Sequence, residues 1–392
     1  MIMVLSEAAE HRFTELAGDT ARDPGKPVDG LTVQVHHDEL LVRIGLVDDS
    51  FPPPIAGIQS TPCYIIAPGF KGAPSPSKPF INVCLSKTEA LTAQYHPEAA
   101  TNVVDCEIEV IRLEADVFNR VQGILDTSIL NPMTVAVFGL GSGGSVIALE
   151  LAKAGTGNFV LTDFDRLKAH NIARHVCGLS DVGRFKTQAV RDAILQHNPR
   201  ATVTCYETDV TQDTELLYEA VRDCDVVVVA TDTELSRNLI NEACLDLGAV
   251  AVYGGAYERA FAGEVVRVVP DSGGCYACVR QRTASMIRSL SSQQSFDYTD
   301  DEEFQAEPGL GLDVAFIALL QAKVALMTLL RGTDSSVGDI DAQMIIWTNT
   351  ARPEDGKLFA EPMARYFVSV SKSPDCPACG EITESDPDAP AP

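Results

Sequence analysis

The sequence predicts an α/β protein in which a smaller β-rich domain precedes a doubly wound parallel sheet. The chain has 392 residues, which is too long for one ordinary core and fits two domains. Before about residue 116, short apolar runs are separated by Pro-rich pieces, which is typical of strands joined by loops. From about residue 133, apolar runs alternate with helical patterns, which is typical of a parallel sheet covered by helices.

We expect residues 1–115 to form the β-rich domain. Its apolar runs include Leu31–Val35, Leu40–Ile44 and Phe80–Val83, and its Pro-rich pieces lie at 51–54 and 73–79. Runs of this length, broken by Pro and Gly, favour strands and turns over a helical bundle. The sequence assigns no role to this domain.

We expect residues 116–380 to form the doubly wound domain and residues 381–392 to form a disordered acidic tail. The expected strands are Val135–Phe138, Phe159–Leu161, Val203–Cys205, Val226–Ala230 and Val250–Tyr253. The expected helices between and after them are Ser145–Lys153, Thr187–Gln196, Thr214–Arg222 and Glu234–Leu245. A sheet of this kind binds its ligands at the carboxyl ends of its strands.

Charge and hydropathy limit the classes of partner. The formal net charge is −25, whereas a surface that follows nucleic-acid phosphates needs clustered Lys and Arg, so we expect no nucleic-acid partner. Residues 1–16 contain three glutamates and lack the apolar core of a secretory signal, so we expect a cytoplasmic protein. The apolar stretch Val314–Leu330 is interrupted by Gln321 and Lys323, which favours a buried or subunit-facing helix over a membrane span.

A glycine-rich loop follows the first expected strand of the second domain. Gly139, Gly141 and Gly144 form G-x-G-x-x-G between that strand and a helical pattern, where helix N–H groups point at an anion. Asp163 ends the next expected strand, where a carboxylate can accept hydrogen bonds from ribose hydroxyls. These residues serve NAD and ATP equally well.

The charged residues that follow favour ATP. Asp165, Asn171, Arg174 and Lys186 lie just beyond the ribose-binding position. Arg174 and Lys186 are cations, and a triphosphate that must meet a second anion needs cations, whereas an NAD site has no evident need for them. Asp232 ends another expected strand and is a candidate to hold Mg²⁺ through its carboxylate. The alternative makes Arg174 and Lys186 surface cations and Asp232 a helix cap.

Four cysteines are paired in sequence. Cys275 with Cys278, and Cys376 with Cys379, form two C-x-x-C motifs, the pattern of a tetrahedral zinc site closed by four thiolates. A zinc ion held by four sulfurs has no open position for catalysis, so the expected role is structural. Redox dithiols and ordinary core cysteines are the alternatives.

These motifs together resemble the ThiF/MoeB/HesA family of ubiquitin-activating-enzyme-like adenylyltransferases, over roughly residues 116–380. The resemblance implies a Rossmann-like fold in which the glycine loop cradles ATP and Asp163 binds ribose. It matches Asn171 and Arg174 to the family's Asn-x-x-Arg and Lys186 to its phosphate-binding lysine. It also matches three further residues to the family's Thr-Asp…Arg…Asn segment: Asp232, Arg237 and Asn241.

Two further features bear on assembly and mechanism. The segment Val117–Ile124 resembles the family's helix before the glycine strand, which implies that Arg120 reaches the ATP site of a neighbouring subunit in a homodimer. The family's thioester cysteine precedes a glycine that matches Gly309, but no cysteine occurs between residues 279 and 375. The resemblance therefore implies adenylation without an evident thioester step. Cys177, near the nucleotide motif, is a remote candidate to replace the thioester cysteine, and the alternative is a buried structural cysteine.

The expected function is ATP-dependent adenylation of a carboxylate, which gives acyl-AMP and pyrophosphate. The resemblance implies that the carboxylate is the C-terminus of a ubiquitin-like or sulfur-carrier protein, or of a peptide. The expected ligands are ATP, Mg²⁺ and a structural zinc ion. An NAD-dependent oxidoreductase and a non-catalytic nucleotide-binding scaffold are the alternatives.

Overall fold

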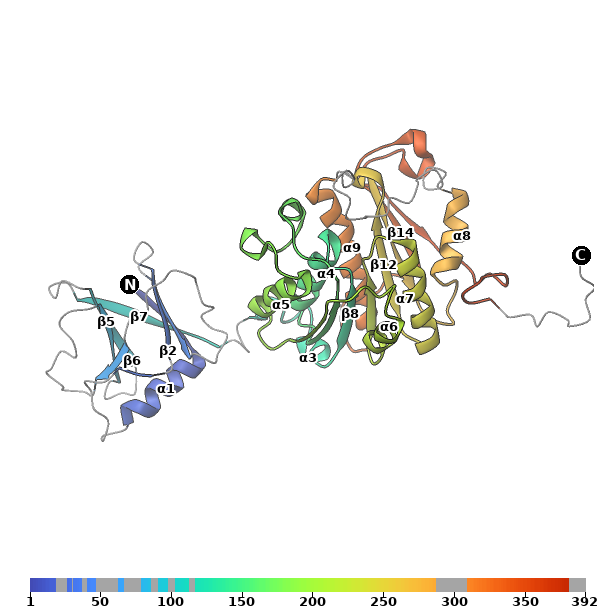
Figure 1. Ribbon diagram of the computed structural model, residues 1–392. Helices are drawn as coiled ribbons and strands as arrows, with labels where there is room; N and C mark the ends of the chain where they lie inside the picture. The colour runs from blue at the N-terminus through green and yellow to red at the C-terminus, as the bar shows by residue number, and fades with distance from the viewer. Residues whose placement is uncertain are drawn as a thin grey trace, which may run out of the picture. The chain divides into compact units, whose positions relative to one another are not determined.

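The computed structural model describes residues 1–18, 27–29, 31–36, 41–46, 63–66, 79–85, 91–97, 103–112, 117–286 and 309–380. The chain divides into two compact units, Met1–Arg120 and Val121–Pro392 (Figure 1). The acidic tail predicted for residues 381–392 and the stretch 301–308, which lacks the thioester cysteine, lie outside the described residues.

In the described part of the first unit, a mixed sheet packs against helix α1 (Figure 1). Its strand order is β2-β3-β1-β7-β6-β5-β4. Helix α1 begins directly after β1, where Ser6 Oγ accepts a hydrogen bond from the Ala9 N–H (3.1 Å) and caps the first turn. The elements are β1 (Ile2–Ser6), α1 (Glu7–Gly18), β2 (Leu31–His36), β3 (Leu41–Leu46), β4 (Cys63–Ile66), β5 (Phe80–Leu85), β6 (Leu91–His96) and β7 (Val104–Ile111).

The core of this unit lies between α1 and the sheet. Phe13 of α1 packs with strand residues such as Met3, Leu5, Val42 and Ile44, and all of these side chains are fully buried. The prediction of a β-rich unit is confirmed. Helix α1 was not predicted, because its apolar positions are too few to give a strong helical period.

The second unit is built on a sheet of order β10-β9-β8-β11-β12-β13-β14-β15. The strands from β10 to β12 are parallel, and β13, β14 and β15 continue the sheet as antiparallel strands. The strands are β8 (Thr134–Phe138), β9 (Asn158–Thr162), β10 (Thr202–Tyr206), β11 (Val226–Val229), β12 (Ala251–Ala256), β13 (Ala262–Val268), β14 (Met344–Thr348) and β15 (Arg365–Val368).

Helices cover both faces of this sheet (Figure 1). Val135 and Val137 of β8 belong to the core that contains α4, α5 and α9, whereas Ala136 and Phe138 belong to the core that contains α6, α7 and α8. The doubly wound sheet predicted from the sequence is therefore confirmed. The α-helices are α3 (Thr127–Leu130), α4 (Ser142–Lys153), α5 (Lys186–His197), α6 (Thr214–Val221), α7 (Glu234–Leu247), α8 (Tyr276–Met286) and α9 (Gly311–Leu329).

Helix α9 is, within the described part of the chain, the one helix long and apolar enough to cross a membrane. Its Gln321 side chain donates hydrogen bonds to the carbonyl oxygens of Val229 (3.0 Å) and Val252 (2.9 Å), which belong to adjacent strands of the central sheet. Buried residues on the same helix include Ile317, Ala318 and Ala325. The helix is therefore part of the domain core, as the sequence predicted.

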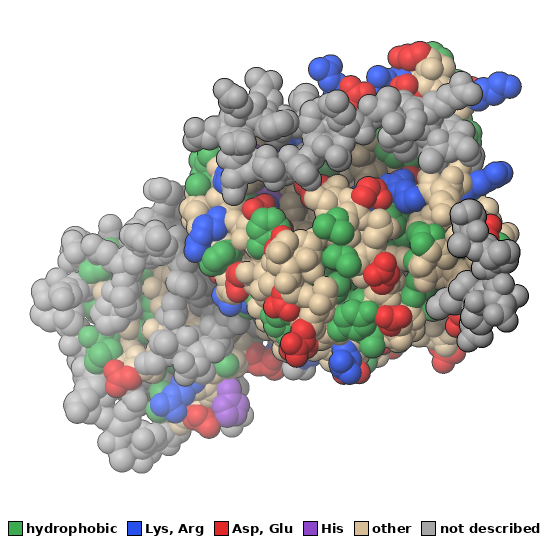
Figure 2. Space-filling view, turned by 45° about the vertical axis from the view of Figure 1, so that its right-hand side comes forward, with side chains coloured by type: hydrophobic (Ala, Val, Ile, Leu, Met, Phe, Trp, Pro, Cys, Tyr) green, Lys and Arg blue, Asp and Glu red, His purple; other side chains and the backbone are tan. Residues whose placement is uncertain are grey.

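One face of the second unit shows how its acidic side chains are distributed. On the face drawn in Figure 2, the described Asp and Glu side chains lie singly among polar and apolar ones. The acidic charge is therefore not gathered into one patch on that face.

Candidate functional site

The glycine loop joins β8 to α4 at the carboxyl edge of the sheet. Gly139 has φ +84°, and a Cβ there would lie 2.8 Å from the Ala230 carbonyl oxygen. A Cβ on Gly144 would lie 1.8 Å from the Gly139 carbonyl oxygen, whereas a Cβ on Gly141 would meet no atom within 4 Å. Gly139 and Gly144 are thus required by the protein's own packing. Gly141, the N-cap of α4, leaves open space at the start of that helix, where N–H groups favour an anion.

Asp163 lies beside this loop, directly after β9. Its Oδ2 accepts a hydrogen bond from the Leu140 N–H (2.6 Å), and its Oδ1 accepts one from the Asp165 N–H (2.8 Å). Burial raises the pKa of this carboxyl, although the Lys186 ammonium and the two N–H groups lower it. Each carboxylate oxygen retains acceptor capacity, which suits the ribose hydroxyls of a nucleotide.

Lys186 is the first residue of α5, and its side chain is only 9% exposed. Its Nζ lies 2.6 Å from Asp165 Oδ2 and 4.0 Å from Asp163 Oδ1. A buried ammonium needs such partners, because an unpaired charge in the protein interior is strongly destabilising. The alternative that made Lys186 a surface cation is therefore wrong.

His175 belongs to the same cluster, and the sequence analysis did not identify it. The Leu140 carbonyl lies 2.8 Å from His175 Nε2, and the Cys177 N–H donates to Nδ1 (3.1 Å). Because Nδ1 accepts, the ring is neutral with its proton on Nε2. Burial lowers the pKa of His175. Its position directly after Arg174 was the available signal in the sequence.

Cys177 is a poor candidate for a thioester. Its side chain is buried, and burial raises the pKa of its thiol to about 12. The thiolate is the nucleophilic form, so this cysteine is inert near neutral pH. The remote substitute considered from the sequence therefore receives no support.

Asn171 and Arg174 lie on the short 3₁₀ helix η1 (Ala169–Arg174). Asn171 Oδ1 accepts a hydrogen bond from the Lys168 N–H (2.8 Å) and so holds the start of that turn. Arg174 lies beside the start of α9, since its Nη1 is 3.7 Å from the position that a Cβ on Gly309 would take. This half-buried side chain therefore reaches away from η1 toward α9.

Asp232 follows β11 and is exposed. Thr233, and not Asp232, caps α7, because its Oγ1 accepts a hydrogen bond from the Ser236 N–H (3.2 Å). The alternative that made Asp232 a helix cap is therefore wrong. The neighbouring residues Ala230 and Thr231 lie against Gly139 of the glycine loop. Asp232 therefore lies on the same carboxyl edge of the sheet as that loop.

Arg237 and Asn241, both on α7, hydrogen-bond to backbone groups of neighbouring segments. Buried Arg237 donates through Nε to the Thr231 carbonyl (2.9 Å) and through Nη2 to the Gly254 carbonyl (2.9 Å). Asn241 Oδ1 accepts a hydrogen bond from the Tyr276 N–H at the start of α8 (3.0 Å). Arg237 therefore ties the loop after β11 to β12, and Asn241 ties α7 to the start of α8.

The four paired cysteines form one cluster. The Sγ atoms lie 4.0 Å apart for Cys275 and Cys278, 3.6 Å for Cys275 and Cys376, and 3.5 Å for Cys278 and Cys379. These separations are too long for disulfides, but they match the edge of about 3.8 Å of a tetrahedron with Zn–S bonds of about 2.3 Å. The donor set therefore fits zinc.

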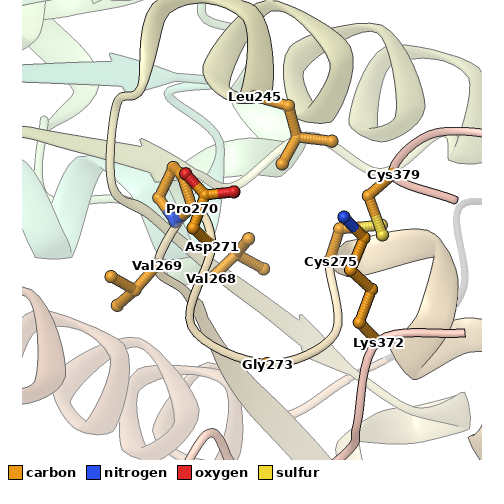
Figure 3. Close-up of a pocket in the computed structure, with 9 residues that line it drawn as sticks. All are labelled: Leu245, Val268, Val269, Pro270, Asp271, Gly273, Cys275, Lys372 and Cys379. Atoms are coloured by element: carbon orange, nitrogen blue, oxygen red, sulfur yellow. The ribbon is translucent and has the colours of Figure 1, made fainter. Parts of the chain in front are cut away.

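The cluster joins the start of α8 to the segment after β15. Figure 3 shows Cys275 and Cys379 in the wall of a small cavity, together with Leu245, Pro270 and Lys372. Among the described residues, this group of cysteines has the arrangement of a metal site. The cluster is separate in the fold from the glycine loop, as a structural role predicts.

The structure brings some predicted residues together and leaves others apart. Hydrogen bonds connect the glycine loop to Asp163, Asp163 to Asp165 and Asp165 to Lys186. Residues 117–124 form turns and not the helix that the resemblance implied; Arg120 is exposed there, and no contact within the described residues joins it to the glycine loop. Its role therefore stays a prediction.

Residues 117–351 match the ThiF family. The chain belongs to this family. The resemblance inferred from the motifs is thereby confirmed for the larger unit. ThiF membership also fits the doubly wound sheet and the connected glycine loop, Asp163 and Lys186.

Two curated proteins that resemble this ThiF protein are named as enzymes. It is 29% identical to the SAMP-activating enzyme E1 of Haloferax volcanii over 250 residues, which cover 63% of this chain and 80% of the relative. It is 33% identical to the sulfur carrier protein ThiS adenylyltransferase of Escherichia coli over 160 residues, 40% of this chain and 60% of the relative. The prediction of an adenylyltransferase-type enzyme is confirmed at the level of the family.

The solved structure of E. coli MccB resembles this protein in fold. The TM-score is 0.50 at 19% identity, and the match covers 66% of this chain and 68% of the other. This likeness supports the architecture of the larger unit.

Proposed function

We propose that this ThiF protein adenylates a carboxylate with ATP and releases pyrophosphate. One observation carries the proposal: the open position at Gly141, the Asp163 carboxylate and the Lys186–Asp165 ion pair adjoin one another at the carboxyl edge of the sheet. A nucleotide whose phosphates lie at the α4 N-terminus and whose ribose meets Asp163 fits this arrangement.

The chemistry requires two anions to meet. A carboxylate oxygen attacks the α-phosphorus of ATP, the bond from that phosphorus to the bridging oxygen breaks, and pyrophosphate leaves with the electron pair. Lys186 and Arg174 supply positive charge, and the N–H groups at the start of α4 supply oriented dipoles. Lys186 exchanges part of its contact with Asp165 for a phosphate oxygen. No side chain needs to act as a nucleophile, because the enzyme positions two substrates.

Asp232 is the residue that would hold Mg²⁺. Mg²⁺ in nucleotide sites takes one or two carboxylates, substrate phosphates and water, and an exposed carboxylate beside the glycine loop suits that pattern. When bound, the ion would neutralise phosphate charge. The four cysteines would hold zinc as a structural staple between α8 and the chain after β15.

The carboxylate donor is proposed to be the C-terminus of a ubiquitin-like or sulfur-carrier protein, or of a peptide. The name of the E. coli relative, a ThiS adenylyltransferase, supports this class. We propose a cytoplasmic homodimer in which exposed Arg120 completes the neighbouring subunit's site. Nucleic acid and membrane are not proposed as partners.

The test is ATP–pyrophosphate exchange with purified protein, Mg²⁺ and small proteins that end in Gly-Gly and are encoded nearby. Exchange that depends on one candidate establishes adenylation and identifies the substrate. Asp232→Ala and Arg174→Ala are expected to lower that exchange by about 100-fold or more, because each removes charge stabilisation from the transition state. Untouched exchange in both variants would contradict the assignment of these residues.

A further inference from the structure

The hairpin between β12 and β13 carries an unusual tip. Among the described residues, Arg259 and Ala260 are consecutive, neither is Gly, Asn or Asp, and both have φ +55°. Left-handed backbone at such residues is destabilising and persists only where the surroundings enforce it. Strain of this kind concentrates at binding sites, so the tip calls for a functional account.

The surroundings enforce this conformation from several sides. The Ala260 N–H donates to the Tyr257 carbonyl (2.7 Å), and the Asn349 side chain donates to the Ala260 carbonyl (2.8 Å) and to the Asp313 carbonyl (3.1 Å). The Arg352 guanidinium lies 4.4 Å from the centre of the Phe261 ring. The tip is therefore fixed to β14 and to the start of α9.

The fixed tip presents a cation. Arg259 is exposed, and no hydrogen bond or ion pair joins its guanidinium to another described residue. Ala260 Cβ and Arg174 Nη1 each lie 3.7 Å from the position of a Cβ on Gly309. The strained backbone thus carries an uncommitted arginine at the residue next to Ala260, whose Cβ lies near the same position as the Arg174 guanidinium.

Strand order places the tip on one side of the glycine loop and Asp163 on the other. Along the carboxyl edge, Asp163 follows β9, the glycine loop follows β8, Asp232 follows β11, and the tip joins β12 to β13. Neighbouring strands lie about 4.8 Å apart, so β12 is about 10 Å from β8 on the side away from the ribose position. With the ribose at Asp163, as proposed, the side of the glycine loop that carries the tip is left for the second substrate.

We propose that Arg259 is a specificity-determining residue that binds the incoming carboxylate-bearing tail and guides it toward the α-phosphate. The inference rests on the proposed adenylation and extends it to the second substrate. Guanidinium groups recognise carboxylates through paired N–H donors, and a rigid mount lowers the entropy lost on binding.

The experiment measures KM for ATP and KM for the Gly-Gly protein that gives the largest wild-type pyrophosphate exchange. Arg259→Ala and Arg259→Gly are expected to raise KM for that protein about tenfold, the effect of one charge-assisted hydrogen bond, and to change KM for ATP less than about twofold. Arg259→Lys is expected to fall between these variants and the wild type. The matched control is Arg222→Ala, which removes an exposed arginine after α6 at the opposite edge.

Arg259→Gly separates binding from folding. Glycine adopts positive φ without strain, so this variant is expected to raise Tm by about 2 °C while it still weakens the second substrate. An unchanged KM for the Gly-Gly protein in both variants refutes the role of Arg259 and leaves adenylation standing. A raised KM for ATP alone assigns Arg259 to the nucleotide instead. Absence of wild-type exchange with every Gly-Gly protein and every candidate peptide refutes adenylation itself, and this inference falls with it.

Discussion

The same Gly→Ala substitution is expected to act in opposite ways at two positions of the glycine loop. At Gly144 a Cβ would lie 1.8 Å from the Gly139 carbonyl oxygen, so backbone must move by about 1 Å to admit it. Overpacking against backbone costs about 3 kcal/mol, which lowers Tm by about 6–12 °C for a unit of this size. Gly144→Ala is thus a stability variant.

At Gly141 the Cβ would meet no protein atom within 4 Å, and the cost is the weaker N-cap preference of Ala, about 0.5–1 kcal/mol. The added methyl occupies the space assigned to phosphate, so ATP affinity is expected to fall about tenfold or more. Thermal unfolding followed by circular dichroism, and calorimetric titration with a non-hydrolysable ATP analogue, measure the two effects. Normal nucleotide binding by Gly141→Ala would refute the proposed phosphate position at Gly141. An unchanged Tm for Gly144→Ala would refute the packing argument.

Three further predictions follow from the site and the cysteine cluster. Cys278→Ser is expected to lose the bound zinc and to lower Tm by about 10 °C or more, whereas Cys205→Ser keeps the metal, as elemental analysis of both proteins would show. Neutral His175 contributes stability that is fully present above the ordinary histidine pKa of about 6.5. This stability is lost as the pH falls from that value toward the lowered pKa of the folded state, because the unfolded chain then binds more protons. The variant His175→Gln should flatten this pH dependence of the unfolding free energy in urea titrations between pH 8 and 5. Co-expressed Arg120→Ala and Asp232→Ala chains, each inactive alone, should regain about a quarter of wild-type exchange if subunits share sites, and no recovery would count against the shared site.

The sequence determined the class of the fold and the parts of the site that are local in the chain. Alternating apolar runs and helical patterns predict a parallel sheet because burial on both faces requires continuous apolar strands. The glycine loop with Asp163 and the paired cysteines were readable because each motif imposes its geometry over a few residues. Helix α4 begins at Ser142, before the predicted Ser145, because the glycine loop itself supplies the first helical turn.

Only the tertiary structure decided which residues meet. The Lys186–Asp165 ion pair, the His175 contact with Leu140 and the convergence of the hairpin tip with Arg174 at Gly309 join segments far apart in sequence. No periodicity records such contacts, because they depend on strand order and on how each loop leaves the sheet. The distinction between Gly141 and Gly144 is of the same kind. Both are glycine in the sequence, and the packing around each assigns one to the ligand and the other to the fold.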